Sequence, residues 1–317
     1  MHAVTDHPGG LTRDHVVWAY RLLLDRDPEN EEVIGPKLAG SRDTRELRNH
    51  LITSAEFRAK NPDFARTNDS TIVITEIGPR DARVRLFVDL SDHVIGLNIV
   101  RGTYERDEIA FVKRLLKPGD IVIDAGAHIG FFTIQMASIV GPGGRVYAFE
   151  PCDTNAELLE RSICENRFDE RVVVQRAAVG AASGSAILTY AVETLNTGGA
   201  YLLRDGTAPL AGNVERRVAV VALDESHIGR PVRFIKMDVE GAEPQVLEGA
   251  ERLIAQDRPV ILSELHPAQL QRASGIGADE FLTRIRRMGY RAQDAHGAPI
   301  ERAPADAMVS IVLVPLG

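Results

Sequence analysis

The 317-residue sequence predicts an α/β fold, in which a mostly parallel sheet carries helices on both faces and a small all-α domain precedes it. Three observations favour this fold. Apolar residues recur at helical spacing before residue 70, short apolar runs alternate with helical segments after residue 71, and acidic residues end several of those runs. Strand–helix alternation is typical of a parallel sheet covered on both sides. We therefore predict two domains, 1–70 and 71–317.

The composition is that of an ordinary globular protein, with 44% hydrophobic and 26% charged residues. A net charge of −8 argues against nucleic acid as a partner, because surfaces that bind nucleic acid are usually basic. No apolar run reaches the length of a membrane span, and the first residues lack the pattern of a signal peptide. Two cysteines are too few for a disulfide framework. These features predict a cytoplasmic protein without a membrane partner.

Helices dominate the predicted N-terminal domain. A first helix is expected between Thr12, a suitable N-cap, and Pro28, which ends it. A second helix is expected within 43–53 and a third from Thr53 onward. The polar segment after Pro62 is typical of a linker to the second domain.

The second domain begins with two alternating strand patterns, 71–77 and 83–90. Strands and helices then follow in alternation. The further strands are predicted at 121–124, 145–149, 171–175, 232–238, 259–264 and 308–314. The helices are predicted at 105–116, 130–140, 153–166, 243–256 and 278–288. The last strand is expected to pair antiparallel, and the long segment 180–215 is expected to be a functional loop.

The stretch IVIDAGAHIG carries the clearest signal for a ligand site. Its strand ends on Asp124, and Gly126 and Gly130 open the next helix, which lets a ligand approach the backbone closely. A dinucleotide fingerprint would read G-x-G-x-x-G, but His128 takes the place of the second glycine. Asp124 would also repel a pyrophosphate. The stretch therefore favours a cationic ligand without phosphate, such as S-adenosylmethionine, over a nicotinamide dinucleotide.

Three more predicted strands also end in acidic residues. Glu150 follows the next strand, where an acidic residue typically accepts hydrogen bonds from ribose hydroxyls. Asp238 and Glu264 end two strands farther along the chain, and Glu243 is open to interpretation as a helix-terminal charge. A solvated strand end is the alternative for each residue taken singly. Together with Asp124 they predict a pocket for a positively charged ligand.

The sequence resembles the FkbM-type methyltransferases, which are S-adenosylmethionine-dependent O-methyltransferases of bacterial secondary metabolism and glycan decoration. The resemblance covers about 102–267 and rests on GDIVIDAGAHIGFFT, VYAFEP, LNTGGAYLL, ALDE and IKMDVEGAEPQVLEGA. It implies a class I, seven-stranded, Rossmann-like methyltransferase sheet. The family commonly has Asn where this chain has His128. The predicted cofactor-binding residues are Asp124, Gly126, Ala127, His128, Gly130, Glu150, Pro151, Ala178 and Asp238.

Methyl transfer to a hydroxyl requires a group that removes or stabilises a proton. In one scheme His266 is the general base, oriented by Glu264 or Asp238. In the other, Asp238, Glu264 and His266 hold Mg²⁺, which binds the substrate oxygen. The residues predicted to contact the substrate are Tyr104, Glu105, Asn196 and Glu240.

The predicted function is S-adenosylmethionine-dependent O-methylation of a small-molecule acceptor, a hydroxyl of a sugar or of a secondary metabolite such as a polyketide. The alternatives are a nicotinamide-dependent oxidoreductase and a non-catalytic assembly protein on a methyltransferase scaffold. The N-terminal words AYRLLLDRDPE and LITSAEFRA resemble a small bacterial helical domain of uncharacterised role. Substrate binding, formation of a homodimer and cover for the sheet remain open for this domain, and interaction is favoured.

Overall fold

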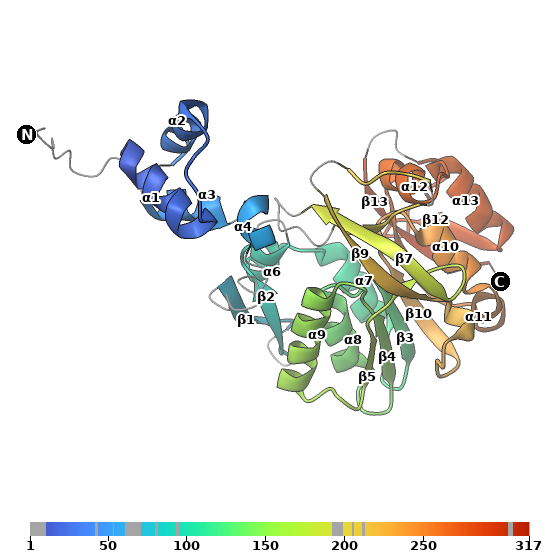
Figure 1. Ribbon diagram of the computed structural model, residues 1–317. Helices are drawn as coiled ribbons and strands as arrows, with labels where there is room; N and C mark the ends of the chain where they lie inside the picture. The colour runs from blue at the N-terminus through green and yellow to red at the C-terminus, as the bar shows by residue number, and fades with distance from the viewer. Residues whose placement is uncertain are drawn as a thin grey trace, which may run out of the picture. The chain divides into compact units, whose positions relative to one another are not determined.

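The structure is a computed structural model. It describes residues 11–41, 44–52, 54–60, 71–79, 82–92, 95–191, 199–204, 206–210, 213–303 and 307–316. The chain forms two compact units, Met1–Ser70 and Thr71–Gly317 (Figure 1). Within the described ranges, no helix combines the length and the apolar character that crossing a lipid bilayer requires.

The N-terminal unit is helical. Its described helices are α1 (Arg13–Leu24), α2 (Glu31–Ala39), α3 (Thr44–Ile52) and α4 (Ala55–Lys60). Thr12 caps α1 as predicted, because its hydroxyl accepts a hydrogen bond from the His15 N–H. The α2 helix was not predicted, although Asn30 caps it in the usual way by accepting from the Val33 N–H. The core of this unit consists of Val16, Tyr20, Leu24, Ile34, Leu47, Leu51 and Phe57.

The larger unit is built on a seven-stranded mixed sheet, which confirms the predicted fold class. The strands lie in the order β12-β13-β11-β10-β3-β4-β5. They span β3 (Ile121–Ala125), β4 (Arg145–Phe149), β5 (Val172–Gln175), β10 (Val232–Met237), β11 (Val260–Leu265), β12 (Tyr290–Gln293) and β13 (Val309–Pro315). The last strand, β13, pairs antiparallel with both β11 and β12, as expected, whereas the pairs from β11 to β5 are parallel.

Helices cover both faces of this sheet (Figure 1). One layer contains α6 (Gly96–Val100), α7 (Arg106–Leu115), α8 (Phe131–Val140) and α9 (Asp153–Asn166), with the hairpin of β1 (Ile72–Ile77) and β2 (Val84–Asp89). The other contains α10 (Glu243–Glu248), α11 (Glu251–Asp257), α12 (Pro267–Ala273) and α13 (Ala278–Arg287). Val122 and Phe234 pack into the first layer, whereas their neighbours Ile123 and Ile235 pack into the second. The central strands are apolar throughout because both of their faces are buried.

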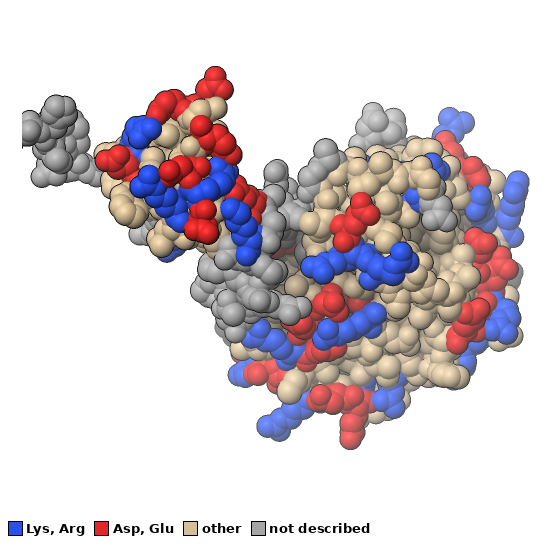
Figure 2. Space-filling view, viewed as in Figure 1, with Lys and Arg blue, Asp and Glu red and all other residues tan. Residues whose placement is uncertain are grey.

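The segment predicted as a loop at 180–215 contains strands. A four-stranded sheet in the order β6-β9-β7-β8 consists of β6 (Ala178–Val179), β7 (Gly184–Ala191), β8 (Tyr201–Leu202) and β9 (Asn213–Val221). In Figure 2 basic side chains lie over β7 and β9, and β9 carries the exposed Arg216 and Arg217. Leu188 and Leu202 line a cavity instead. The segment therefore forms a wall with a polar outer face and an apolar inner face.

Two helical predictions also differ from the structure. The helix predicted at 243–256 is divided into α10 and α11 at Gly249, where a Cβ atom would lie 2.0 Å from the Gly180 carbonyl oxygen. The α12 helix was not predicted from the sequence. Pro267 begins the helix, a position at which its missing N–H is not needed.

The packing of α12 gives a first prediction. Leu270 is fully buried, so L270A should lower the free energy of unfolding by about 2–5 kcal/mol, as truncations of buried leucine do. Leu210, with half of its side chain exposed, provides the matched control, and L210A should change the value by less than about 0.5 kcal/mol. Chemical denaturation of both variants measures the difference. Equal stability of the two would mean that α12 does not pack as described.

Candidate functional site

A cavity of about 340 Å³ lies at the edge of the large sheet where β3, β4, β10 and β11 end. Parallel strands bring their carboxyl ends to one edge, which is where open α/β sheets bind ligands. The predicted site residues that line it are Tyr104, Glu105, Gly126, Ala127, His128, Glu150, Pro151, Ala178, Asp238, Glu240 and Glu264. Asp124, Gly130 and His266 are not part of its lining, and Asn196 lies outside the described residues.

The loop after β3 packs tightly between its neighbouring strands. Gly126 has a φ of 79°, and a Cβ atom there would lie 1.9 Å from the Asp238 carbonyl oxygen, so only glycine fits. The N–H groups of Gly126 and Ala127 both donate to the Phe149 carbonyl oxygen, at 3.0 and 2.9 Å. The loop is thereby fixed to the ends of both β4 and β10.

Three residues without the freedom of glycine adopt left-handed backbone conformations in the cavity wall. They are Glu105, His128 and Glu240, with φ values of 44°, 51° and 56°. Such a conformation costs roughly 1–2 kcal/mol for most residues. Backbone strain of this kind is often found at functional sites, so its presence supports a ligand-binding role for the cavity.

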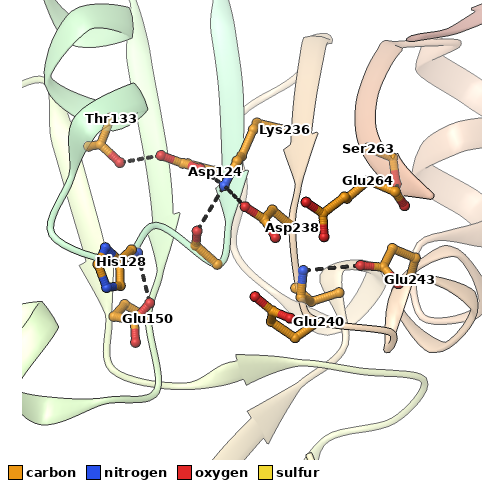
Figure 3. Close-up of polar contacts among 12 residues, drawn as sticks. Asp124, His128, Thr133, Glu150, Lys236, Asp238, Glu240, Glu243, Ser263 and Glu264 are labelled. Atoms are coloured by element: carbon orange, nitrogen blue, oxygen red, sulfur yellow. Dashed lines mark hydrogen bonds and ion pairs between the residues drawn. The ribbon is translucent and has the colours of Figure 1, made fainter. Parts of the chain in front are cut away.

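Glu150 is buried at the end of β4 and reaches across to the β3 loop. Its Oε2 accepts from the His128 N–H at 2.8 Å (Figure 3). Its Oε1 accepts from the Cys152 N–H, also at 2.8 Å. Asn155 donates a further bond to Oε1 at 3.3 Å. Burial raises the pKa of Glu150 to about 7, although these hydrogen bonds oppose the shift. The carboxyl group is therefore held rigidly at the cavity wall.

Asp124 occupies a different position from the one predicted. Its side chain is fully buried, and the Thr133 hydroxyl donates to Oδ2 at 2.5 Å. Its Oδ1 has no hydrogen-bond partner, and the nearest cation is the Lys236 Nζ, 4.0 Å away. Burial raises the pKa of Asp124. Asp124 lies within β3, one residue before its end, and is not among the residues that line the cavity, so its bond to Thr133 joins β3 to α8.

Lys236 is a site residue that the sequence reasoning missed. It is buried in β10, and its Nζ donates to the Gly126 carbonyl oxygen and to Asp238 Oδ2, both at 3.1 Å (Figure 3). Burial lowers the pKa of Lys236, but the carboxylates of Asp238 and Asp124 outweigh burial and raise it. A lysine two residues before Asp238 in an apolar strand was the available signal, because positions i and i+2 share one face of a strand.

The part of the cavity wall formed by Asp238, Glu240 and Glu264 is acidic. The carboxyl groups of Asp238 and Glu264 face each other, and Glu240 lies beside them (Figure 3). Burial, followed by the charge of Asp238, raises the pKa values of Glu240 and Glu264 and raises that of Glu105 to about 7. At neutral pH these groups hold protons more readily than ordinary carboxyls, so the wall can both accept and donate protons.

Glu243 has a structural role at the start of α10, where the sequence allowed it to be a helix-terminal charge. Its buried Oε1 accepts from the N–H groups of Val239 and Gly241, at 3.2 and 3.4 Å, and so fixes the turn between β10 and α10. Gly241 is required in that turn, because a Cβ atom there would lie 2.2 Å from the Gln269 carbonyl oxygen.

The predicted Mg²⁺ site does not form. Within the described ranges, no group of three or more His, Cys, Asp or Glu side chains is arranged to hold a metal ion. Asp238 is already paired with Lys236, and His266 lies off the cavity wall at the N-cap of α12. The His266 Nδ1 is buried without a hydrogen-bond partner. The side chains of Asp238, Glu264 and His266 are therefore not arranged to bind a magnesium ion together.

Comparison with known proteins identifies relatives. The family model described as the methyltransferase FkbM domain matches residues 124–292. The 31-O-demethyl-FK506 methyltransferase FkbM of Streptomyces tacrolimicus is 30% identical over 162 residues, which cover 43% of this chain and 61% of that protein. The chain thus spans less than two thirds of the length of this curated relative.

Solved structures of methyltransferases are similar at low identity. FkbM from Methylobacillus flagellatus is 16% identical with a TM-score of 0.42, over 94% of this chain and 58% of that one. A SAM-dependent O-methyltransferase from Thermotoga maritima is 15% identical with a TM-score of 0.40, over 77% and 78% of the two chains.

The buried carboxyl of Glu150 predicts a pH dependence of stability. Its pKa is about 7 in the folded chain against an ordinary 4.5, so between these values the folded state holds a proton that the unfolded state has lost. Its contribution to stability is therefore present at low pH and is lost as the pH rises from 4.5 to 7. E150Q should flatten the fall in unfolding free energy across that window, measured by denaturation. An unchanged slope would contradict the assignment.

Proposed function

This chain belongs to the FkbM methyltransferase-domain family, and we propose that it is an S-adenosylmethionine-dependent O-methyltransferase. The observation that carries the proposal is the cavity at the ends of β3, β4 and β10, which combines the glycine loop, Glu150 and a carboxylate wall. When bound, S-adenosylmethionine supplies a methyl group on a positively charged sulfur. Carboxylates suit that charge better than they suit a phosphate.

The described residues fit such a ligand. Gly126 leaves the space of a Cβ atom empty, so a ligand can approach the loop backbone, and His128 is held by its bond to Glu150. We assign the cofactor side to Gly126, Ala127, His128, Glu150 and Pro151, together with Ala178 of the small sheet. On this assignment the carboxyl of Glu150 accepts hydrogen bonds from the ribose, since it is the acidic group at the end of β4.

On this proposal the acidic wall binds the acceptor and removes the proton of its hydroxyl group. An alcohol is a poor nucleophile at neutral pH, so a base at the cavity must take its proton. We assign this role to Glu264, which faces Asp238 and whose pKa is raised by burial and by Asp238. A base is most effective when its pKa lies near the working pH. His266, the base expected from the sequence, is a weaker candidate because it is not part of the cavity lining.

The acceptor that we propose is a small molecule rich in hydroxyl groups, a sugar or a secondary metabolite such as a polyketide. Tyr104, Glu105 and Glu240 line the acceptor side, and their oxygen atoms can accept hydrogen bonds from hydroxyls. The name of the Streptomyces tacrolimicus relative, a methyltransferase acting on an O-demethylated compound, supports this class. We further propose that the protein acts in the cytoplasm and that its N-terminal unit provides an interaction surface, of which a homodimer is one form.

A direct binding comparison tests the cofactor assignment. Calorimetric titration should show saturable binding of S-adenosylmethionine and S-adenosylhomocysteine, and no binding of NADH or NADPH at the same concentrations. The reason is that the acidic lining attracts a cation and repels pyrophosphate. Binding of the nicotinamide dinucleotides alone would point to an oxidoreductase. Binding of none of these ligands by a folded protein would favour a non-catalytic role.

The assignment of the base predicts different effects for two neighbouring residues. With an acceptor found by screening sugars and polyketides, E264Q should lower kcat by about 10²–10⁴-fold, the usual contribution of a general base. Its affinity for S-adenosylhomocysteine should stay close to that of the unmodified chain. H266N, as the comparison variant, should retain most of the turnover. A larger loss in H266N than in E264Q would return the role of the base to His266.

A further inference from the structure

The charges that line the cavity are unequal in sign. Among the described lining residues, Lys236 is the one lysine or arginine. The acidic residues that share the lining are Glu105, Glu150, Asp238, Glu240 and Glu264. Every cationic ligand would therefore be attracted strongly if Lys236 were absent, because opposite charges interact more strongly in a partly buried cavity than in water.

Lys236 is fixed by groups from three elements. Its Nζ lies 3.1 Å from Asp238 Oδ2, just beyond β10, and 4.0 Å from Asp124 Oδ1 in β3. It also donates to the Gly126 carbonyl oxygen and lies 5.3 Å from the centre of the Phe132 ring in α8. A side chain with this many partners has little freedom to move away when a ligand enters. Its charge is a permanent part of the cavity.

Asp238 differs from the other acidic residues of the cavity lining in having this partner. Among the described acidic residues of the lining, Asp238 forms an ion pair with Lys236 at 3.1 Å. Glu240 is instead bonded to the Gln269 amide, and Glu150 to backbone N–H groups. The Lys236–Asp238 pair thus neutralises the carboxylate that lies nearest to the junction between the glycine loop and the acceptor wall.

The proposed reaction changes the charge of its donor. S-adenosylmethionine carries a positive sulfur, whereas S-adenosylhomocysteine has a neutral one. We propose that Lys236 sets the charge discrimination of the cavity, because its ammonium group cancels the Asp238 carboxylate and limits the preference of the site for the cationic donor over the neutral product. This inference rests on the proposed function. Lys236 is in this sense a positioning and selectivity residue and not a base.

The test measures the affinities of both ligands by calorimetry, which requires no acceptor. In K236M the Asp238 carboxylate loses its partner, so the ratio of S-adenosylmethionine affinity to S-adenosylhomocysteine affinity should rise about tenfold, the order expected for one unpaired charge in a partly buried site. In D238N the ammonium group loses its nearest carboxylate, so the ratio should fall by about threefold or more. The double variant K236M/D238N should lie within about twofold of the unmodified chain.

The affinity ratio is expected to rise in K236M and to fall in D238N, and this difference distinguishes a role in charge selectivity from a structural role. Damage to the cavity would weaken both ligands together and leave the ratio unchanged. K113M, which removes an exposed lysine on α7, is the matched control and should leave both affinities unchanged. If K236M does not fold, the sign of the change in D238N alone decides.

Two further outcomes are distinguishable. An unchanged or falling ratio in K236M, with both ligands bound by the unmodified chain, would overturn the inference and leave the proposed function intact. A ratio that rises in D238N would overturn it equally. If the folded, unmodified chain binds neither ligand, the proposed function fails and the inference fails with it.

Discussion

The close contact between the β3 loop and the end of β10 determines the shape of the whole cavity. Gly126 lies so near to the Asp238 carbonyl oxygen that no side chain fits between them. The same junction holds the Lys236 ammonium group, which bonds to the Gly126 carbonyl oxygen and to the Asp238 side chain. Backbone packing and the Lys236–Asp238 ion pair therefore hold the β3 loop against the end of β10 at the same place. The β3 loop and the end of β10, which both line the cavity, are fixed to each other there.

The cavity retains several buried or half-buried carboxyl groups at a cost in stability. Burying a charged group is unfavourable, and the protein meets that cost partly by raising the pKa values of Glu105, Glu150 and Glu264, so that these groups are more often neutral. Asp238 is compensated by Lys236 instead. A fold selected only for stability would have apolar side chains at these positions. Their presence is consistent with a site in which charge and proton transfer are needed.

Local patterns predicted the elements whose burial is regular. The six strands of the large sheet for which bounds were predicted were placed to within about two residues, because most of their apolar runs are bounded by Gly, Pro or acidic residues. The strands β7 and β9 were missed because their outer face is polar, which resembles a loop. Asp238 and Glu264 were recognised as strand ends that share one cavity, whereas the position of Asp124 depends on how deeply β3 is buried. Lys236 could not be assigned a partner from sequence alone, because its neighbours come from β3, α8 and the end of β10.

The hydrogen bonds of the β3 loop explain why a glycine-rich turn at this position need not bind phosphate. Phosphate sites at such turns use free backbone N–H groups that point at the anion. Here the N–H groups of Gly126 and Ala127 both donate to Phe149, that of His128 donates to Glu150, and that of Gly130 donates to Ala127. With these donors occupied, the loop offers an anion little, while the Glu150 carboxyl beside it repels one. Glycine still lets an uncharged or cationic ligand approach the backbone of this turn. Its occupied N–H groups distinguish it from the dinucleotide-binding turns found at the same place in other parallel sheets.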